Sequence, residues 1–162
     1  MVKKMAKPTE GMKEEARKGI EWREEFGRGG TRIGATRARQ IIAGENLSDD
    51  TIKRMFSFFS RHEVDKEAEG FRPGEDGYPS NGRIAWALWG GDAGFSWSRR
   101  LVNQMKEERQ LSDKVKKALQ NKVEEHNAEV NNAASKRTTV RTLGAVFRRG
   151  VGAYYTSQGS VR

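Results

Sequence analysis

The chain has 162 residues, of which 35% are hydrophobic and 33% charged, and its formal net charge is +9. It contains no cysteine, which excludes disulfides, thiol catalysis and cysteine-ligated zinc. No apolar run approaches the roughly 20 residues that cross a membrane, and no apolar stretch follows the basic start as in a secretion signal. The composition predicts a single domain, with or without an appendage, a modest core, and a location inside a cell or a particle.

Two helices are predicted at the start of the chain. The first follows Thr9 as N-cap and stops at the glycines of 27–30. The second starts at Thr31 and ends near Gly44. Apolar residues spaced mostly three or four apart mark the sides expected to face inward: Met12, Ala16, Ile20, Ile33, Ala38, Ile41 and Ile42.

The clearest helix start follows Ser48. Ser48 suits an N-cap, and Asp49 and Asp50 suit the positive end of the helix dipole. The next segment, 63–82, loses all periodicity and contains a series of Pro and Gly turn signals. Aromatic residues within it predict an ordered loop laid over the core. The apolar stripe of the helix and the loop aromatics are Ile52, Met55, Phe56, Phe59, Phe71 and Tyr78.

Four further helices are predicted after the loop. One ends at Gly90 and Gly91, the next is capped by Asp92, and a third is capped by Ser112. The polar segment 131–137 reads as a linker before a last helix over 138–150, and 151–162 reads as a tail.

These elements predict an all-α fold. We expect a compact multi-helix domain with an ordered Gly/Pro-rich loop, followed by a helical extension and a basic tail. The expected segments are a flexible N-terminus over 1–8, the compact helical domain over 9–108, a helix and linker over 109–134, and a basic helix with a Gly/Ser-rich tail over 135–162.

Three of the four tryptophans, Trp86, Trp89 and Trp97, fall within twelve residues. Large aromatic side chains anchor small cores, so we predict that these three form structural core. The alternative is a surface on which a ligand stacks. The sequence "GGDAG" at 90–94 lacks the lysine and the Ser/Thr of a phosphate-binding loop, so it does not indicate a nucleotide site.

The excess positive charge comes from two segments that contain no acidic residue, 27–44 and 135–162. Clustered arginine without acidic neighbours favours a polyanion, because each phosphate contact releases counterions. The alternative is that the arginine stems cover apolar surface while their charged heads stay in water. The predicted nucleic-acid-binding residues are Arg32, Arg39, Arg54, Arg61, Arg141, Arg148 and Arg149.

No catalytic or metal-binding motif stands out. His62, Glu63 and Asp65 lie together at the end of one predicted helix, but their spacing is not that of a metal site. The sequence therefore predicts no catalytic residue, no metal and no cofactor.

Two long stretches resemble proteins of tailed bacteriophages. Residues 13–105, which contain "EARKGIEWREEFGRGG", "SRHEVD" and "RIAWALWGGDAGFSW", resemble a small phage domain that has no settled function. The end, "VRTLGAVFRRGVGAYYTSQGSVR", resembles the opening of a second phage segment that normally continues further, so a truncated, processed or split version is expected. The resemblance implies phage origin, and hence the host cytoplasm or the virion, and supplies no catalytic residues.

The favoured interpretation is a phage accessory or virion-associated protein that binds nucleic acid non-specifically through its arginine clusters. The alternative is a structural or assembly module that docks on another phage protein. A metal-dependent enzyme, such as a nuclease around His62, has the least support. The expected partners are nucleic acid or another phage protein, and not a membrane.

Overall fold

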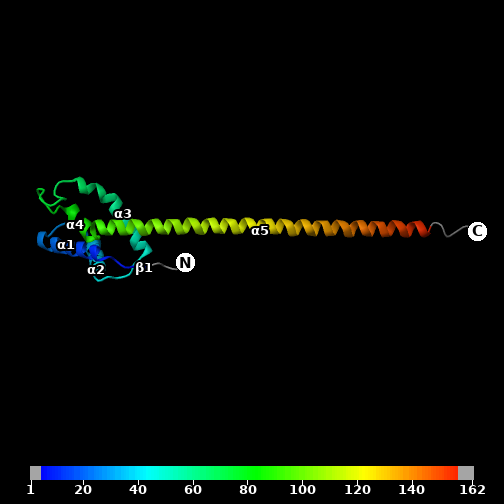
Figure 1. Cartoon of the computed structure of the whole chain (residues 1–162), viewed down its shortest axis with the longest axis horizontal. Helices are drawn as coiled ribbons and strands as arrows, with labels where there is room; N and C mark the ends of the chain where they lie inside the picture. The colour runs from blue at the N-terminus through cyan, green and yellow to red at the C-terminus, as the bar shows by residue number, and fades with distance from the viewer. Residues whose placement is uncertain (1–4, 157–162) are drawn as a thin grey trace, which may run out of the picture. The chain divides into compact units, whose positions relative to one another are not determined.

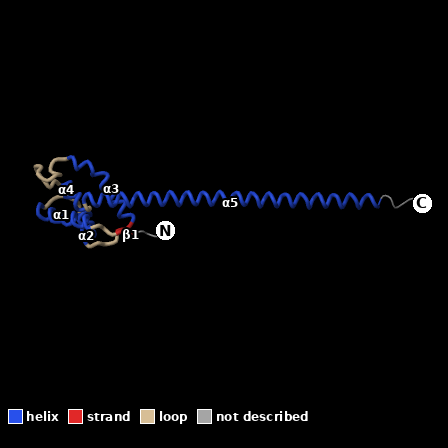
Figure 2. The backbone as a smooth tube through the Cα atoms, viewed as in Figure 1, coloured by secondary structure: helices blue, strands red, loops and turns tan. Residues whose placement is uncertain are grey.

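The computed structural model describes the backbone of residues 5–156 and the side chains of residues 5–148. It is 78% helical, and the predicted all-α class is confirmed. Among the described residues the only sheet is one short antiparallel pair, in which Met5 lies opposite Ser48 and Ala6 opposite Leu47 (Figure 2). The elements are β1 (Met5–Ala6), α1 (Glu10–Phe26), α2 (Arg32–Ile42), β2 (Leu47–Ser48), α3 (Asp49–His62), the 3-10 helix η1 (Glu63–Glu67), α4 (Asn81–Leu88) and α5 (Gly91–Thr156) (Figure 1).

Contacts within the chain divide it into two compact units. The N-terminal unit is Met1–Glu108 and the C-terminal unit is Arg109–Arg162. The N-terminal unit contains β1 through α4 and the residues of α5 up to 108. In the C-terminal unit the described residues, 109–156, are all helical.

Hydroxyl side chains cap the starts of α1, α2, α3 and α4 in the N-terminal unit. The hydroxyl of Thr9 accepts from the backbone N–H of Met12 at 3.4 Å, and the hydroxyl of Thr31 accepts from Gly34 at 3.2 Å. The predicted cap at Ser48 is confirmed in the same way. Ser80 caps α4, a start that the sequence analysis did not assign to any residue.

Helices α1 and α4 pack closely because a glycine lies between them. A β-carbon added at Gly19 of α1 would lie 2.7 Å from the backbone nitrogen of Leu88 in α4. Real side chains do not approach so closely, so this crossing requires glycine. Along the same side of α1, Met12 and Ala16 are fully buried, as predicted.

The core of the N-terminal unit is built around the indole of Trp86, which is 2% exposed. Its ring meets Phe59 of α3 edge-on at 4.7 Å and Phe95 of α5 at 5.7 Å. Phe71, from the loop after η1, lies at 6.1 Å. The indole nitrogen of Trp86 donates to Oδ1 of Asp92 at 3.0 Å, so the one polar atom of the ring has a partner.

The Gly/Pro-rich loop is ordered, as predicted. Phe71 is buried, and Tyr78 packs edge-on against Trp22 of α1 at 5.7 Å. The backbone N–H of Ser80 donates to the carbonyl oxygen of Gly70 at 2.7 Å, which closes the loop just before α4. The loop therefore covers one side of the core.

The expectation that Ile33 faces inward is wrong, because its side chain is 67% exposed. The buried positions of α2 are Gly34, Ala35, Ala38 and Ile41. With about 100° between successive residues of a helix, Ile33 falls on the other side from this set.

The helix interruptions predicted beyond residue 108 are also wrong. Ser112 and the segment 131–137 lie inside α5, and the helix continues past Gly150 to Thr156. Between Gly94 and Gly144 the chain has no glycine or proline, so polar composition alone did not break the helix. Hydroxyls of Thr138, Thr139 and Thr142 donate to carbonyls four residues earlier, as helical threonines often do. The rest of the predicted tail, 157–162, lies outside the described residues.

Replacing Trp86 with alanine should destabilise the N-terminal unit by about 3–5 kcal/mol, because a fully packed aromatic side chain leaves a cavity. Trp89→Ala should cost clearly less, because Trp89 is only partly buried. Urea unfolding followed by the fluorescence of the remaining tryptophans, all of which lie in the N-terminal unit, measures both. Equal losses in the two variants would contradict the central place given to Trp86.

Candidate functional site

The arginines predicted to bind nucleic acid do not form one surface. Arg32 and Arg39 lie on α2, and Arg54 and Arg61 lie on α3, all four exposed in the N-terminal unit. Arg141 and Arg148 are exposed on α5 in the C-terminal unit, and the side chain of Arg149 lies outside the described residues.

Two of these arginines line one cleft. The cleft has a volume of about 440 Å³ and lies between the start of α2, the second half of α3 and the end of α4. Arg54 and Arg61 are seven residues apart on α3, which places both on the same side of that helix. No acidic residue is among those that line this cleft, which we call the arginine cleft.

Aromatic side chains form the apolar part of the arginine cleft. Trp89 stacks on Phe58, with ring centroids 4.6 Å apart and planes 12° apart. The ring of His62, one helical turn after Phe58, lies 4.7 Å from it. Trp89 and His62 are not fully buried, so the cleft combines guanidinium groups with partly accessible rings.

Arg37 of α2 is partly buried beside Trp89 and was not among the predicted site residues. Its guanidinium carbon is 5.9 Å from the centre of the Trp89 ring, and its Nη1 donates to the side chain of Gln40. Burial, and then the nearby positive charge of Arg54, lower the pKa of Arg37. Its buried Nε has no hydrogen-bond partner within the described residues.

The arginines of the cleft lack direct ion pairs. Among the described residues, neither Arg54 nor Arg61, nor the neighbouring Arg37, forms an ion pair with a carboxylate. Within the same residues, the one hydrogen bond of the Arg61 side chain goes to the carbonyl oxygen of Ser57, one turn earlier. Several guanidinium groups held together without carboxylates are the arrangement that attracts an anion.

Arg39 lines a second, smaller cleft of about 380 Å³ beside the turn that follows α1. Arg23 and Arg28 line it as well, but Glu24 is also present. Arg28 donates to the side-chain oxygen of Asn81 at 2.9 Å. Arg32 lines neither of the two clefts.

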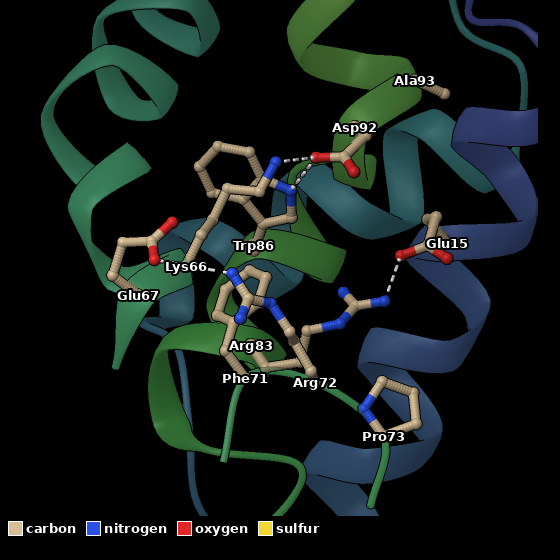
Figure 3. A pocket seen from close by; sticks show the side chains of 10 residues that line it. All are labelled: Glu15, Lys66, Glu67, Phe71, Arg72, Pro73, Arg83, Trp86, Asp92 and Ala93. Atoms are coloured by element: carbon tan, nitrogen blue, oxygen red, sulfur yellow. Dashed lines mark hydrogen bonds and ion pairs between the residues drawn. The ribbon is translucent and has the colours of Figure 1, made fainter. Parts of the chain in front are cut away.

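A third cleft, of about 470 Å³, lies where α1, η1, the loop and the start of α5 meet (Figure 3). Its charges are paired: Arg83 donates to Glu15 at 2.9 Å, and Lys66 and the indole nitrogen of Trp86 both donate to Asp92. Arg72 lies 3.5 Å from Glu67. The pairing leaves the lining of this cleft without net charge, although the buried Nη1 of Arg83 has no hydrogen-bond partner among the described residues. The cleft therefore attracts a charged ligand less than the arginine cleft does.

The tryptophans divide between core and cleft. Trp86 and Trp97 are buried, with exposures of 2% and 5%, whereas Trp89 reaches the arginine cleft. Trp86 and Trp89 are three residues apart, but Trp89 lies just beyond the last residue of α4, where the backbone leaves the helical conformation. The three-residue spacing alone therefore could not predict that Trp86 lies in the core and Trp89 at the arginine cleft.

The described residues contain no cluster of three or more side chains suited to holding a metal ion. His62, considered above as a metal ligand, is 3.0 Å from Asp65 through Nδ1. His126 is exposed in the C-terminal unit. No helix of the described part of the chain is long and apolar enough to cross a membrane.

No protein family, no curated protein and no solved structure matches this chain. The resemblance to phage domains therefore stays a prediction, and the candidate site rests on the geometry of its residues.

The third cleft gives a test of its structural role. Glu15→Gln should destabilise the N-terminal unit by about 1–3 kcal/mol, because it leaves the charge of Arg83, whose side chain is only 14% exposed, without its carboxylate partner. Glu14→Gln is the matched control, since Glu14 is exposed on the same helix. Urea unfolding measures both variants. Equal stability of the two variants would show that the Arg83–Glu15 pair contributes nothing.

Proposed function

We propose that this protein binds nucleic acid without sequence preference and that the arginine cleft of the N-terminal unit is its main contact. The observation that carries the proposal is the position of Arg54 and Arg61 around a cleft that no acidic residue lines. Arg37 adds a third positive charge next to Arg54.

Phosphate groups fit the arginine side chains of this cleft. A guanidinium group presents several N–H donors in a plane, and it binds phosphate oxygens in pairs. Arg54 and Arg61 are two turns apart on α3, and arginines spaced along one helix side suit the successive phosphates of a chain.

The aromatic part of the cleft fits the base and the sugar of a nucleotide. Bases and sugars present apolar faces, and proteins that bind nucleic acid without sequence preference combine cationic grooves with aromatic rings. Trp89 and the half-exposed ring of His62 supply this kind of surface. Among the described residues, no asparagine or glutamine lines the cleft to pair with a base edge, which favours binding without sequence preference.

The distribution of charge supports the same conclusion. Arg32, Arg37 and Arg39 belong to an acid-free segment, 27–44, that runs beside the cleft. The second acid-free segment, 135–162, adds Arg141 and Arg148 on exposed positions of α5. Together with the resemblance to phage domains, these features support a role as an accessory or virion-associated phage protein that meets nucleic acid in the host cytoplasm or the virion.

We expect Arg54→Gln with Arg61→Gln to weaken binding to duplex and single-stranded DNA. Each lost phosphate contact should lower the steepness of the salt dependence by about 0.9 in a log–log plot on duplex DNA. Fluorescence anisotropy with two unrelated sequences at several salt concentrations measures affinity, slope and sequence preference. The matched control is Arg17→Gln with Arg100→Gln, which changes the net charge equally at exposed positions outside the arginine cleft.

The outcomes separate the proposal from its alternatives. If the wild-type chain binds neither sequence at about 50 mM salt, where phosphate contacts are strong, nucleic-acid binding fails altogether. If the control loses as much affinity as the cleft variant, binding follows net charge and not the cleft. Replacing Arg141, Arg148 and Arg149 by glutamine measures the share of the second acid-free segment in the same assay.

A further inference from the structure

The C-terminal unit carries apolar side chains that nothing in the described chain covers. For the five that concern us here, the exposed fraction runs from 52% for Val130 to 76% for Phe147. Folded proteins bury such residues when they repeat along one helix side. The exposed set that concerns us is Leu119, Val123, Val130, Val140 and Phe147.

These residues follow a seven-residue repeat. Counting alternately four and three residues from Leu119 gives 119, 123, 126, 130, 133, 137, 140, 144 and 147. All of these positions hold apolar residues or glycine except His126 and Arg137. An average spacing of 3.5 residues is the spacing of the a and d positions of a coiled coil, and it forms a narrow seam along the helix. We call these nine positions the seam.

The helix that carries the seam is a poor candidate for stability on its own. Its middle, 131–142, contains asparagine, serine and threonine residues, which favour helix less than alanine or leucine do. Most helical stability in proteins comes from packing of an apolar side against another element. The observed helix therefore calls for a partner along the seam.

We infer that the seam is covered by the same seam of a second copy of this chain, with the two helices antiparallel. A partner for a coiled-coil seam must repeat the same spacing over the same length, and this chain itself meets that requirement. An isologous pairing centred between residues 131 and 132 places Val123 opposite Val140 of the second copy. It also places Val130 opposite Ala133 and Leu119 opposite Gly144, whereas Phe147, at the end of the seam, lies opposite Lys116.

The charges beside the seam determine the orientation. In the antiparallel pairing, Glu129 faces Lys136 of the second copy, and the symmetry repeats this pair. Asp113 faces Arg148 of the second copy in the same way. In antiparallel coiled coils the residues just before the a positions of one helix meet those of the other, and the residues just after the d positions do the same. Opposite charges at these positions therefore favour this register.

The parallel pairing brings like charges together instead. Lys136 would flank Arg141 of the second copy. Arg137 would face Arg137 of the second copy across the seam. Like charges at these positions oppose association. In the antiparallel register Arg137 lies opposite His126, so no two arginines meet.

Sedimentation equilibrium of the full chain at several concentrations tests the pairing. Val140→Asp should raise the dissociation constant of the dimer about a hundredfold or more, because the symmetry places two carboxylates in the seam. Val146→Asp is the matched control: Val146 is 64% exposed against 69% for Val140, but it lies outside the seam. The control should dissociate as the wild type does.

Engineered cysteines test the orientation, and the chain has no cysteine of its own to interfere. The double variant Val123→Cys/Val140→Cys should form covalent dimers on mild oxidation, because the two positions face each other across copies. Each single variant should remain uncross-linked. Within one helix the two positions are about 25 Å apart, so a disulfide inside a single chain is excluded.

A monomeric wild-type chain throughout the concentration range would overturn the inference. Cross-linking of Val123→Cys alone would also overturn it, because the proposed antiparallel register keeps the two copies of residue 123 far apart, whereas a parallel pair brings them together. Equal weakening by Val140→Asp and Val146→Asp would show that exposed valines in general, and not the seam, mediate association. DNA binding is not part of any of these measurements, so their failure leaves the proposed function untouched.

Discussion

The indole of Trp86 is the contact on which the N-terminal unit depends. One ring touches Phe59 of α3, Phe71 of the loop and Phe95 of α5, and its nitrogen donates to Asp92. A chain with only 35% hydrophobic residues has few side chains with which to join so many elements. Large aromatic rings solve this problem because each buries a large area from a single position.

The arginine cleft lies at the edge of the same aromatic cluster. Trp89 lies just past the end of α4 and stacks on Phe58, which is itself part of the core. Phe58 and Phe59 are neighbours on α3, and they divide in the same way, Phe59 toward Trp86 and Phe58 toward Trp89. The proposed binding surface is therefore the outer edge of the same aromatic core, so it is held by the packing that holds the fold.

Three helix starts could be predicted from the sequence, because each depends on a capping side chain and the few residues after it. The N-caps at Thr9, Thr31 and Ser48 follow from a hydroxyl and the next few residues, and the structure confirms all three. Ser112 has the same hydroxyl but lies inside α5, because no glycine or proline stops the helix before it. Arg37 could not be selected from its neighbours in sequence, since its role depends on the approach of α2 to Trp89, just after α4.

The two units reach stability by different routes, and the difference bears on function. The N-terminal unit has its own aromatic core, whereas the C-terminal unit exposes its apolar residues and, by our inference, buries them only against a second copy. Each chain contributes one arginine cleft, so a dimer would carry two. Two weak phosphate sites joined in one molecule bind a long polyanion more tightly than either alone, because the second contact becomes intramolecular. Where both clefts reach the same polyanion, self-association through the seam would therefore strengthen the proposed non-specific binding without any additional contact in the cleft.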